Sequence, residues 1–177
     1  MRDLLESDTV SEDAGATARA EWRAEEEQWS RAAFERWEHG RGLDDVLRDC
    51  MQRGDTVTFV FPAVTWSGVV VSVAADVVRV DVGETRVDVR HTADAPFVLR
   101  TRPAGARGGN DVSTELTTFL ARLRELDGTT VCIGTSTVLL EGRLRLGRDQ
   151  LRLTAGDGAV AYVPTASVWW LRPLDAD

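Results

Sequence analysis

The sequence predicts a mostly β protein with helices, in which two small five-stranded barrels follow one another along the chain. Three observations support this prediction. Ten short segments have strand patterns, and several of them alternate apolar and polar residues with period two, which is typical of antiparallel strands with one solvated face. Each set of five segments follows a short helical pattern. The second set also repeats the spacing of the first set.

The N-terminal part precedes both barrels. Residues 1–13 are polar and acidic and carry no periodic apolar residues, so we expect a disordered acidic arm. Residues 14–40 show an amphipathic helical pattern in which Trp22, Trp29 and Trp37 recur on one face. A solvated helix has no need of three tryptophans in a stripe. The helix is therefore expected to lie against its own chain, in preference to a purely intermolecular role.

Residues 41–103 are predicted to form the first barrel. An amphipathic helix begins at Leu43 and is stopped by Gly54. The five strand patterns that follow cover residues 56–61, 66–73, 78–82, 86–90 and 97–99. Residues 104–112 are rich in glycine and carry no apolar periodicity, which is typical of a linker.

Residues 113–177 are predicted to form the second barrel. A helical stripe runs from Leu116 to Leu126, and Gly128 ends it. The strand patterns then cover residues 130–133, 138–146, 150–154, 159–163 and 168–172.

The two halves align position by position, which predicts an internal duplication. The residues of the first helical stripe and Asp76 have counterparts about 73 residues later in the second half, where Asp149 corresponds to Asp76. Gly54 and Gly68 shift by about 74 residues onto Gly128 and Gly142. The pair at residues 102–103 shifts by about 70 onto residues 172–173, which we attribute to a shorter turn after the third strand of the second copy.

Each half resembles the Sm-like fold, the family of eukaryotic Sm and bacterial Hfq proteins. The residues that carry the resemblance are Gly68 and Gly142, midway along a long second strand, and Asp76 and Asp149, which begin the third strand. A glycine lets a strand bend sharply enough to serve both halves of a small barrel. SH3-like barrels share much of this pattern.

The resemblance implies that barrels associate by pairing the fourth strand of one with the fifth strand of the next. It also implies RNA binding through the loops after strands two and four. The fourth loop of the first copy contains Arg90 and His91, whereas the second copy has no basic residue at residues 162–165. A uridine-binding pore of the family's kind is therefore not expected.

The whole chain is also similar to short proteins of high-GC bacteria that are often labelled Fis-family transcriptional regulators. A regulator of that type needs a basic C-terminal helix-turn-helix. The C-terminal segment of this chain has strand patterns only, so we do not adopt that interpretation.

Composition narrows the functional classes. The net charge is −8, and residues 1–49 carry most of it, because 14 acidic residues against 7 arginines leave −7. The basic residues are all arginine, which is typical of a high-GC bacterial gene. Overall acidity argues against non-specific binding to nucleic acid, whose affinity comes mainly from phosphate contacts. No apolar run is long enough for a membrane span or a signal peptide, so a cytoplasmic location is expected.

Two surface features are candidates for binding. Arginines gather on the predicted outward face of the second copy, at Arg143, Arg145, Arg148 and Arg152. They suit phosphates or an acidic partner, although a solvated sheet face or a dock for the chain's own acidic helix explains them more simply. Trp169 and Trp170 are adjacent in a strand pattern, so one of them is expected to enter the core and the other to contact a helix or another subunit.

Neither catalysis nor cofactor binding is indicated. Cys50 and Cys132 are far apart and are read as buried apolar residues, and His39 and His91 are read as solvated loop residues. No enzyme, cofactor, metal or small-molecule substrate is therefore expected. The first hypothesis is an interaction or scaffold protein that self-associates or binds a protein partner, as a monomer or dimer or, if its edges are free, as a ring. The alternative is an RNA-binding regulator related to Hfq, which we disfavour.

Overall fold

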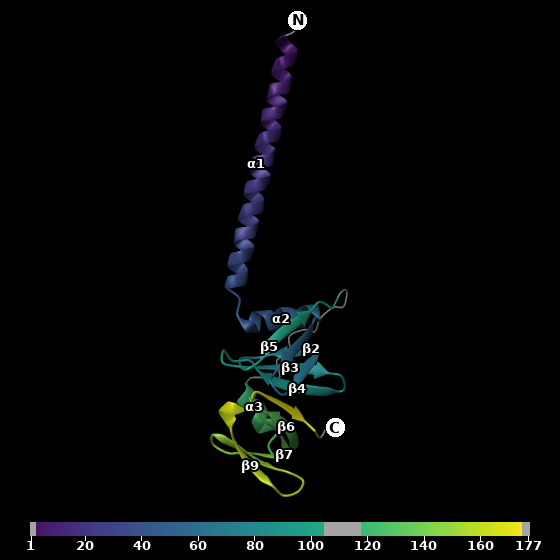
Figure 1. Ribbon diagram of the computed structural model, residues 1–177, viewed down its shortest axis with the longest axis vertical. Coiled ribbons are helices and arrows are strands. Elements are labelled where there is room, and N and C mark those ends of the chain that lie inside the picture. Colours follow the sequence, from purple (N-terminus) through teal and green to yellow (C-terminus); the bar gives the residue numbers. More distant parts are fainter. Residues whose placement is uncertain (1–2, 105–117, 175–177) are drawn as a thin grey trace. The chain divides into compact units, whose positions relative to one another are not determined.

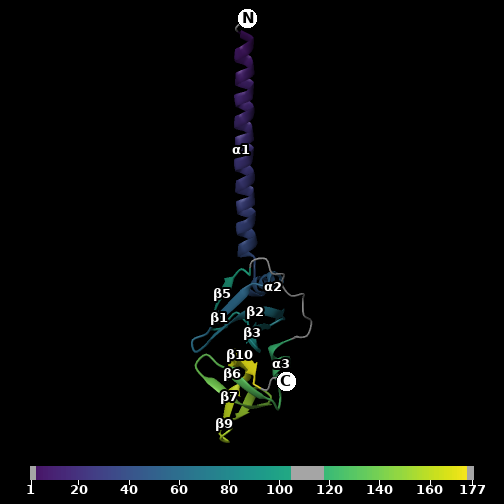
Figure 2. The same cartoon turned by 90° about the vertical axis from the view of Figure 1, so that its right-hand side faces the viewer.

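The computed structural model describes residues 3–104 and 118–174 (Figures 1 and 2). The chain divides into two compact units, residues 1–42 and residues 43–177. The first unit contains one long helix, α1 (Asp3–His39). This helix begins earlier than the predicted start at residue 14, so residues 3–13 are helical and not a disordered arm. The segment contains no proline or glycine, the two residues that most oppose a helix.

The second unit contains two short helices and ten strands, which confirms a mostly β protein with helices. Its first half comprises α2 (Leu43–Arg53), β1 (Thr56–Val60), β2 (Thr65–Val73), β3 (Val77–Val82), β4 (Thr85–Arg90) and β5 (Val98–Arg102). Its second half comprises α3 (Phe119–Glu125), β6 (Thr130–Gly134), β7 (Leu139–Leu146), β8 (Gln150–Thr154), β9 (Val160–Pro164), a short 3-10 turn (Thr165–Ser167) and β10 (Trp170–Pro173). Residues 105–117 lie outside the described part, and they include most of the predicted linker and the start of the second helical stripe.

The ten strands form one antiparallel sheet in the order β5-β1-β2-β3-β4-β10-β6-β7-β8-β9. Within each half the order is therefore the same, with the fifth strand first and the fourth strand last. The halves meet where β4 pairs with β10, through Val89 opposite Trp170 and Asp88 opposite Leu171. The sheet ends at β5 on one side and at β9 on the other.

Corresponding turns in the two halves are closed by corresponding hydrogen bonds. The turn after β2 is closed by Ala74 N–H donating to Val77 O (2.9 Å), and the turn after β7 by Gly147 N–H donating to Gln150 O (2.8 Å). Gly68 and Gly142 also have the same role. A Cβ on Gly68 would overlap the backbone oxygen of Asp81, and a Cβ on Gly142 would lie 2.7 Å from the backbone oxygen of Thr154.

The strand registers explain the drift in the spacing between the halves. Before Val71 the offset is 74 residues, as Val57 opposite Gly68 matches Val131 opposite Gly142. A bulge between Val70 and Ser72 adds one residue to β2, and the offset falls to 73.

The predicted match of residues 102–103 with residues 172–173 is wrong by two positions. Arg172 lies opposite Cys132 as Arg100 lies opposite Thr58, so the offset at the fifth strand is 72 residues. The predicted cause is also wrong. The connection after β3 is shorter than the one after β8, and the residues missing from the second half are in the connection between its fourth and fifth strands.

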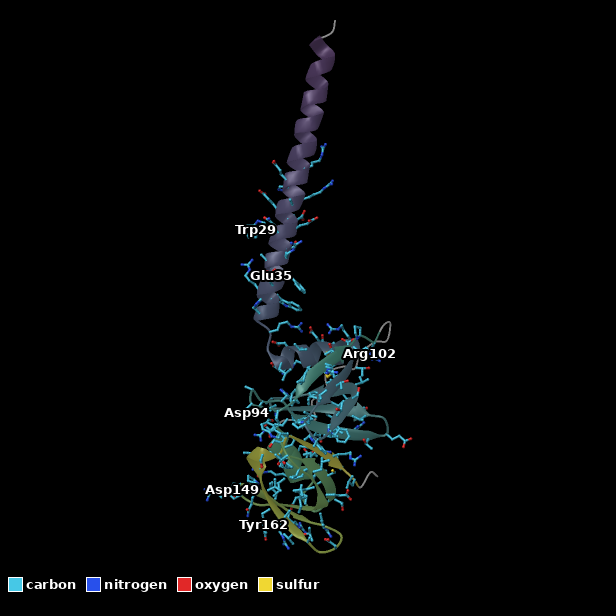
Figure 3. The ribbon with its side chains drawn as sticks, viewed as in Figure 1. Trp29, Glu35, Asp94, Arg102, Asp149 and Tyr162 are labelled. Atoms are coloured by element: carbon cyan, nitrogen blue, oxygen red, sulfur yellow. The ribbon has the colours of Figure 1, made fainter. Side chains whose placement is uncertain are left out.

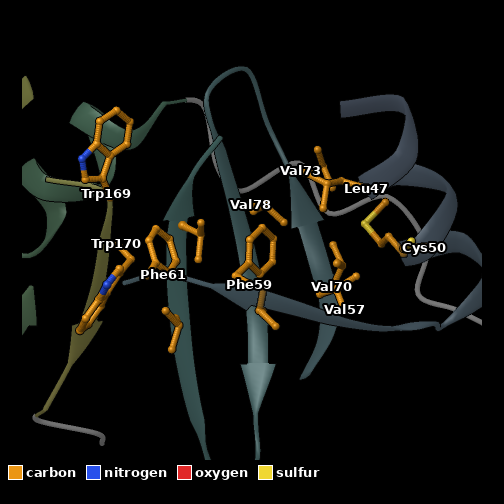
Figure 4. Close-up of a cluster of buried hydrophobic side chains, with 14 residues drawn as sticks. Leu47, Cys50, Val57, Phe59, Phe61, Val70, Val73, Val78, Trp169 and Trp170 are labelled. Atoms are coloured by element: carbon orange, nitrogen blue, oxygen red, sulfur yellow. The ribbon is translucent and has the colours of Figure 1, made fainter. Parts of the chain in front are cut away.

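Two apolar clusters fill the second unit. The first lies under α2 and includes Leu47, Phe59 and Val80, and the second includes Phe119, Leu144 and Leu171. Trp169 and Trp170 belong to the first cluster although they come from the second half of the chain (Figure 4). Val77 joins the second cluster in the opposite direction. The two halves therefore share their apolar cores as well as their sheet.

Candidate functional site

The structure brings three of the four predicted arginines into one cleft of about 780 Å³. Arg143 and Arg145 alternate along the exposed face of β7, and Arg152 lies on β8 directly opposite Arg145. The cleft is lined by Thr130, Glu141, Gly142, Arg143, Arg145, Arg152, Thr154, Ala155 and Gly156. Three arginines against one glutamate give this lining a net charge of +2. Arg148 is exposed in the turn between β7 and β8 and is not part of the lining.

The three arginines differ in how they are held. Arg143 Nε donates to the backbone oxygen of Gly128 at 2.9 Å. Arg145 Nη1 lies 3.4 Å from a carboxylate oxygen of Asp127, in an exposed and therefore weak ion pair. Among the residues that the structure describes, Arg152 has no ion pair or side-chain hydrogen bond. Arg152 is the guanidinium best placed to receive an anion.

Arg145 and Arg152 are directly opposed across two strands. Like charges at opposed positions of an antiparallel pair repel and destabilise the sheet. Asp127 reduces this repulsion by pairing with Arg145. The residues opposite Arg152 are Arg145 and Tyr162, and neither is acidic. An anion bound in the cleft would remove the rest, so the electrostatics favour an anionic ligand.

The cleft lies beside the outer strand β9. Tyr162 is directly opposite Arg152 and shares its face of the sheet, and its side chain is 63% exposed (Figure 3). Val160 on the same strand is also exposed. An edge strand presents unpaired backbone N–H and C=O groups to solvent. An open strand edge, an exposed aromatic ring and an unneutralised arginine are therefore adjacent.

The first half uses the same three sheet positions differently. Two rows of opposed residues correspond by register: the first-half row is Ser72, Arg79 and Asp88, and the second-half row is Arg145, Arg152 and Tyr162. All three members of the first-half row are buried, whereas all three members of the second-half row are exposed.

Asp88 lies at the centre of a buried ionic network that joins the halves. It is fully buried, and it accepts hydrogen bonds from Arg79 Nε and from Arg122 Nε on α3, both at 2.7 Å. Burial alone would lower the pKa of Arg122, but Asp88 and Glu125 outweigh it and hold that pKa above its usual value. Asp76 adds a second link, because its carboxylate accepts the Phe119 N–H at 2.7 Å. Sequence reasoning missed this network, although opposite charges on adjacent strands were a detectable signal.

Arg90 and His91 are held against neighbouring turns of the chain. Arg90 lies 3.9 Å from a carboxylate oxygen of Asp76, and its Nη1 reaches the backbone oxygens of the turn after β9 at 3.5 Å. His91 is buried, with Nε2 3.0 Å from the backbone oxygen of Ala74. The prediction that His91 is a solvated loop residue is wrong, because the loop folds back against the turn that precedes β3. His39 is exposed, with Nδ1 2.6 Å from the backbone oxygen of Glu35.

Trp169 and Trp170 are both buried, so the prediction that one of them stays outside the core is wrong. Trp170 begins β10, a central strand of the sheet, and Trp169 immediately precedes it; both side chains belong to the first apolar cluster. Trp170 packs against Trp66 with ring centroids 4.9 Å apart, and it shares its apolar cluster with Phe61 (Figure 4). Neither tryptophan is available to another subunit.

The tryptophans of α1 are exposed within their own unit. The exposed fractions are 72% for Trp22, 72% for Trp29 and 53% for Trp37. Arg41 lies 4.2 Å from the centroid of the Trp37 ring, in a cation–π contact. These side chains stay candidates for contact with protein.

The cysteines and the other polar clusters add no reactive site. Cys50 is buried and Cys132 is partly buried, both are free, and burial raises the pKa of each thiol. Within residues 3–104 and 118–174, no group of three or more histidine, cysteine, aspartate or glutamate side chains is arranged to hold a metal ion. Over the same residues, every helix is too short or too polar to cross a membrane.

The comparisons with known proteins leave the site to be interpreted from its own chemistry. No protein-family model matches this chain, and no curated protein sequence matches it at a significant level.

Proposed function

We propose that this chain is a non-enzymatic protein-interaction module that binds by adding a strand of a partner to its open sheet edge. The observation that carries the proposal is the joint between β4 and β10. There, the fourth strand of one half accepts the fifth strand of the other half as an antiparallel neighbour. The equivalent fourth strand of the second half, β9, is the outer strand of the sheet, and within the described part of the chain no strand pairs with its free edge.

The composition of β9 supports this role. Natural edge strands are usually protected from pairing by charged residues or by bulges. β9 carries no charged residue, and its register with β8 is regular along its length. Its only protective residue is Pro164 at its end. A peptide strand added to β9 gains main-chain hydrogen bonds, which is a common mode of peptide recognition.

The duplication belongs to the same proposal. The matched strand orders, turn hydrogen bonds and glycine contacts support two fused copies of one Sm-like five-stranded module. In this interpretation the β4–β10 pair corresponds to the contact by which two separate modules associate, and the fusion places both modules in one chain. The scaffold role follows, because a fused pair retains one open edge at each end.

Self-association is the second form of the proposal, and the matching edges β9 and β5 favour it. β5 of a second copy would occupy the position that β10 occupies beside β4, and three chains would close a ring. Such a joint would cover Arg152 without supplying an acid, because β5 carries two arginines and no acidic residue. Unpaired charges are costly to bury. We therefore expect a monomer or dimer in isolation.

RNA binding is the alternative function, and the arginine cleft beside exposed Tyr162 favours it. The net charge of −8 opposes it, because long-range repulsion weakens the phosphate contacts on which such binding depends. We expect weak or no binding at physiological salt. A filter-binding assay that gives a sub-micromolar dissociation constant for RNA would support this alternative, provided that the double variant Arg143→Glu with Arg145→Glu loses the binding.

The test of the proposed function uses a short peptide of alternating valine and threonine, which is neutral and prefers extended structure. Its binding to the full-length protein is followed by amide NMR. The expected result is a set of shift changes confined to β9 and its neighbour β8. Light scattering over a range of protein concentrations measures self-association separately. Absence of shift changes at β9, together with a monomer at all concentrations, would refute the proposal.

A further inference from the structure

We infer that the strand that β9 accepts is an acidic segment of a protein partner, with a carboxylate that neutralises Arg152. This inference rests on the proposed function, because it assumes that β9 accepts a strand. It adds the chemistry of the partner and the residue that selects it.

The argument starts from the difference between the two corresponding rows of the sheet. In the first half, Arg79 is neutralised by Asp88, which is supplied by the neighbouring strand β4. In the second half, the residue in the place of Asp88 is Tyr162, so the neighbouring strand supplies no charge to Arg152. Among the described residues no carboxylate pairs with Arg152, although Glu141 lines the same cleft, so a partner strand can supply one.

A strand added to β9 is well placed to supply it. Adjacent strands lie about 4.8 Å apart, so the added strand would be about 10 Å from β8. Residues of that strand opposite Tyr162 would lie on the same face of the sheet as Tyr162 and Arg152. The ring of Tyr162 lies between them and covers the apolar stems, and a glutamate and an arginine are long enough to meet over it.

The edge discriminates between peptides and phosphate polymers. The backbone N–H and C=O groups of a strand edge are complementary to another peptide backbone. The phosphate groups of RNA only accept hydrogen bonds, so its donors would have to come from irregularly placed bases and 2′-hydroxyls and not from a backbone that matches the edge. The cleft itself contains no aromatic side chain on which a base could stack. The observations therefore favour an acidic peptide over RNA.

A second copy of this chain fits less well, for two reasons. The complementary edge β5 has the sequence Val98-Leu99-Arg100-Thr101-Arg102, which brings two more positive charges. At the internal β4–β10 joint, helix α3 contributes Arg122, which pairs with the carboxylate of Asp88. A basic residue in that position would repel Arg152 and could not neutralise it. Neither feature neutralises Arg152.

The test measures the fluorescence anisotropy of two labelled peptides with the full-length protein. One peptide alternates valine with glutamate, and the other alternates valine with glutamine. The glutamate peptide is expected to bind at least ~10-fold more tightly, which corresponds to about 1.4 kcal/mol. The preference should shrink as salt is raised, because the pair is partly solvated.

Two variants of equal charge locate the effect. Arg152→Ala is expected to abolish the preference for glutamate and to leave the binding of the glutamine peptide unchanged. Arg148→Ala removes the same charge from the nearby turn, outside the cleft, and should retain at least half of the preference. Circular dichroism verifies that both variants fold, which we expect because both arginines are exposed.

The outcomes separate this inference from the proposed function. If both peptides bind equally at β9 and Arg152→Ala changes neither, the inference is wrong and the proposed function stands. If neither peptide binds, the inference is wrong, and the proposed function is wrong as well unless the protein self-associates in light scattering. If single-stranded RNA or inorganic phosphate binds at the cleft more tightly than the glutamate peptide and displaces it, the inference is overturned in favour of a phosphate site.

Discussion

Replacing Asp88 by alanine tests the most consequential contact in the fold. The Asp88 carboxylate is fully buried between Arg79, which is 8% exposed, and Arg122 of α3. Removal of one partner from a buried ion pair typically costs about 3–5 kcal/mol, because it leaves an uncompensated charge. The total stability of a domain is only about 5–15 kcal/mol, so Asp88→Ala should remove a large part of it.

The matched control lies in the same hairpin. Asp81 pairs with Arg86 at 3.0 Å, but these side chains are 41% and 63% exposed. Such a surface pair contributes about 0–1 kcal/mol, so Asp81→Ala should be nearly neutral. Urea unfolding followed by circular dichroism gives the free energy of unfolding of both variants. If Asp88→Ala and Asp81→Ala destabilise the protein equally, within about 0.5 kcal/mol, the buried network does not join the halves as argued.

Three further substitutions test other parts of the structure. Gly68→Ala should cost about 1–3 kcal/mol or more, because its Cβ would overlap the backbone of β3, whereas Gly156→Ala meets open space and should be neutral by the same urea assay. Trp170→Ala should cost about 3–5 kcal/mol, since this ring is 1% exposed and packs into the core of the other half; an unchanged unfolding midpoint would contradict that role. Asp55 accepts a hydrogen bond from Arg53, which holds the pKa of Asp55 below its usual value. This stabilisation is complete above the unfolded pKa of about 3.9 and is lost as the pH falls through the lower folded pKa, so the stability difference between wild type and Asp55→Asn should shrink below about pH 4.

The candidate site was only partly predictable from the sequence. Period-two alternation placed Arg143, Arg145 and Arg152 on one outward face, and in the structure all three are exposed and line one cleft. The same alternation could not show that Tyr162 lies opposite Arg152, because register between strands depends on turn lengths and bulges. Arg148 was grouped with the others by its position in the sequence, but the turn carries it away from the lining.

The errors have a common physical origin. One of Trp169 and Trp170 was expected to stay outside the core, and His91 was expected to be a solvated loop residue, because strand alternation and loop position describe only local surroundings. In the structure β10 pairs with β4, so that the fifth strand of the second half becomes a central strand. Side chains next to that joint are then buried from both sides. Alternation within a strand does not show which edges meet, and the expectation that a fourth strand pairs with a fifth came only from the resemblance to Sm-like barrels.

The sequence by itself determined the elements of this protein. Apolar periodicity indicated the ten strands and the helix before each set, and glycine and aspartate spacing indicated the matched halves. These features depend on interactions between residues close along the chain, which the sequence displays directly. The tertiary structure decided which strand edges were joined and which stayed open. That choice depends on the fit of Asp88 with Arg79 and Arg122 and of Trp170 with Trp66, between side chains brought together only by folding. It leaves β9 and Arg152 open to a partner.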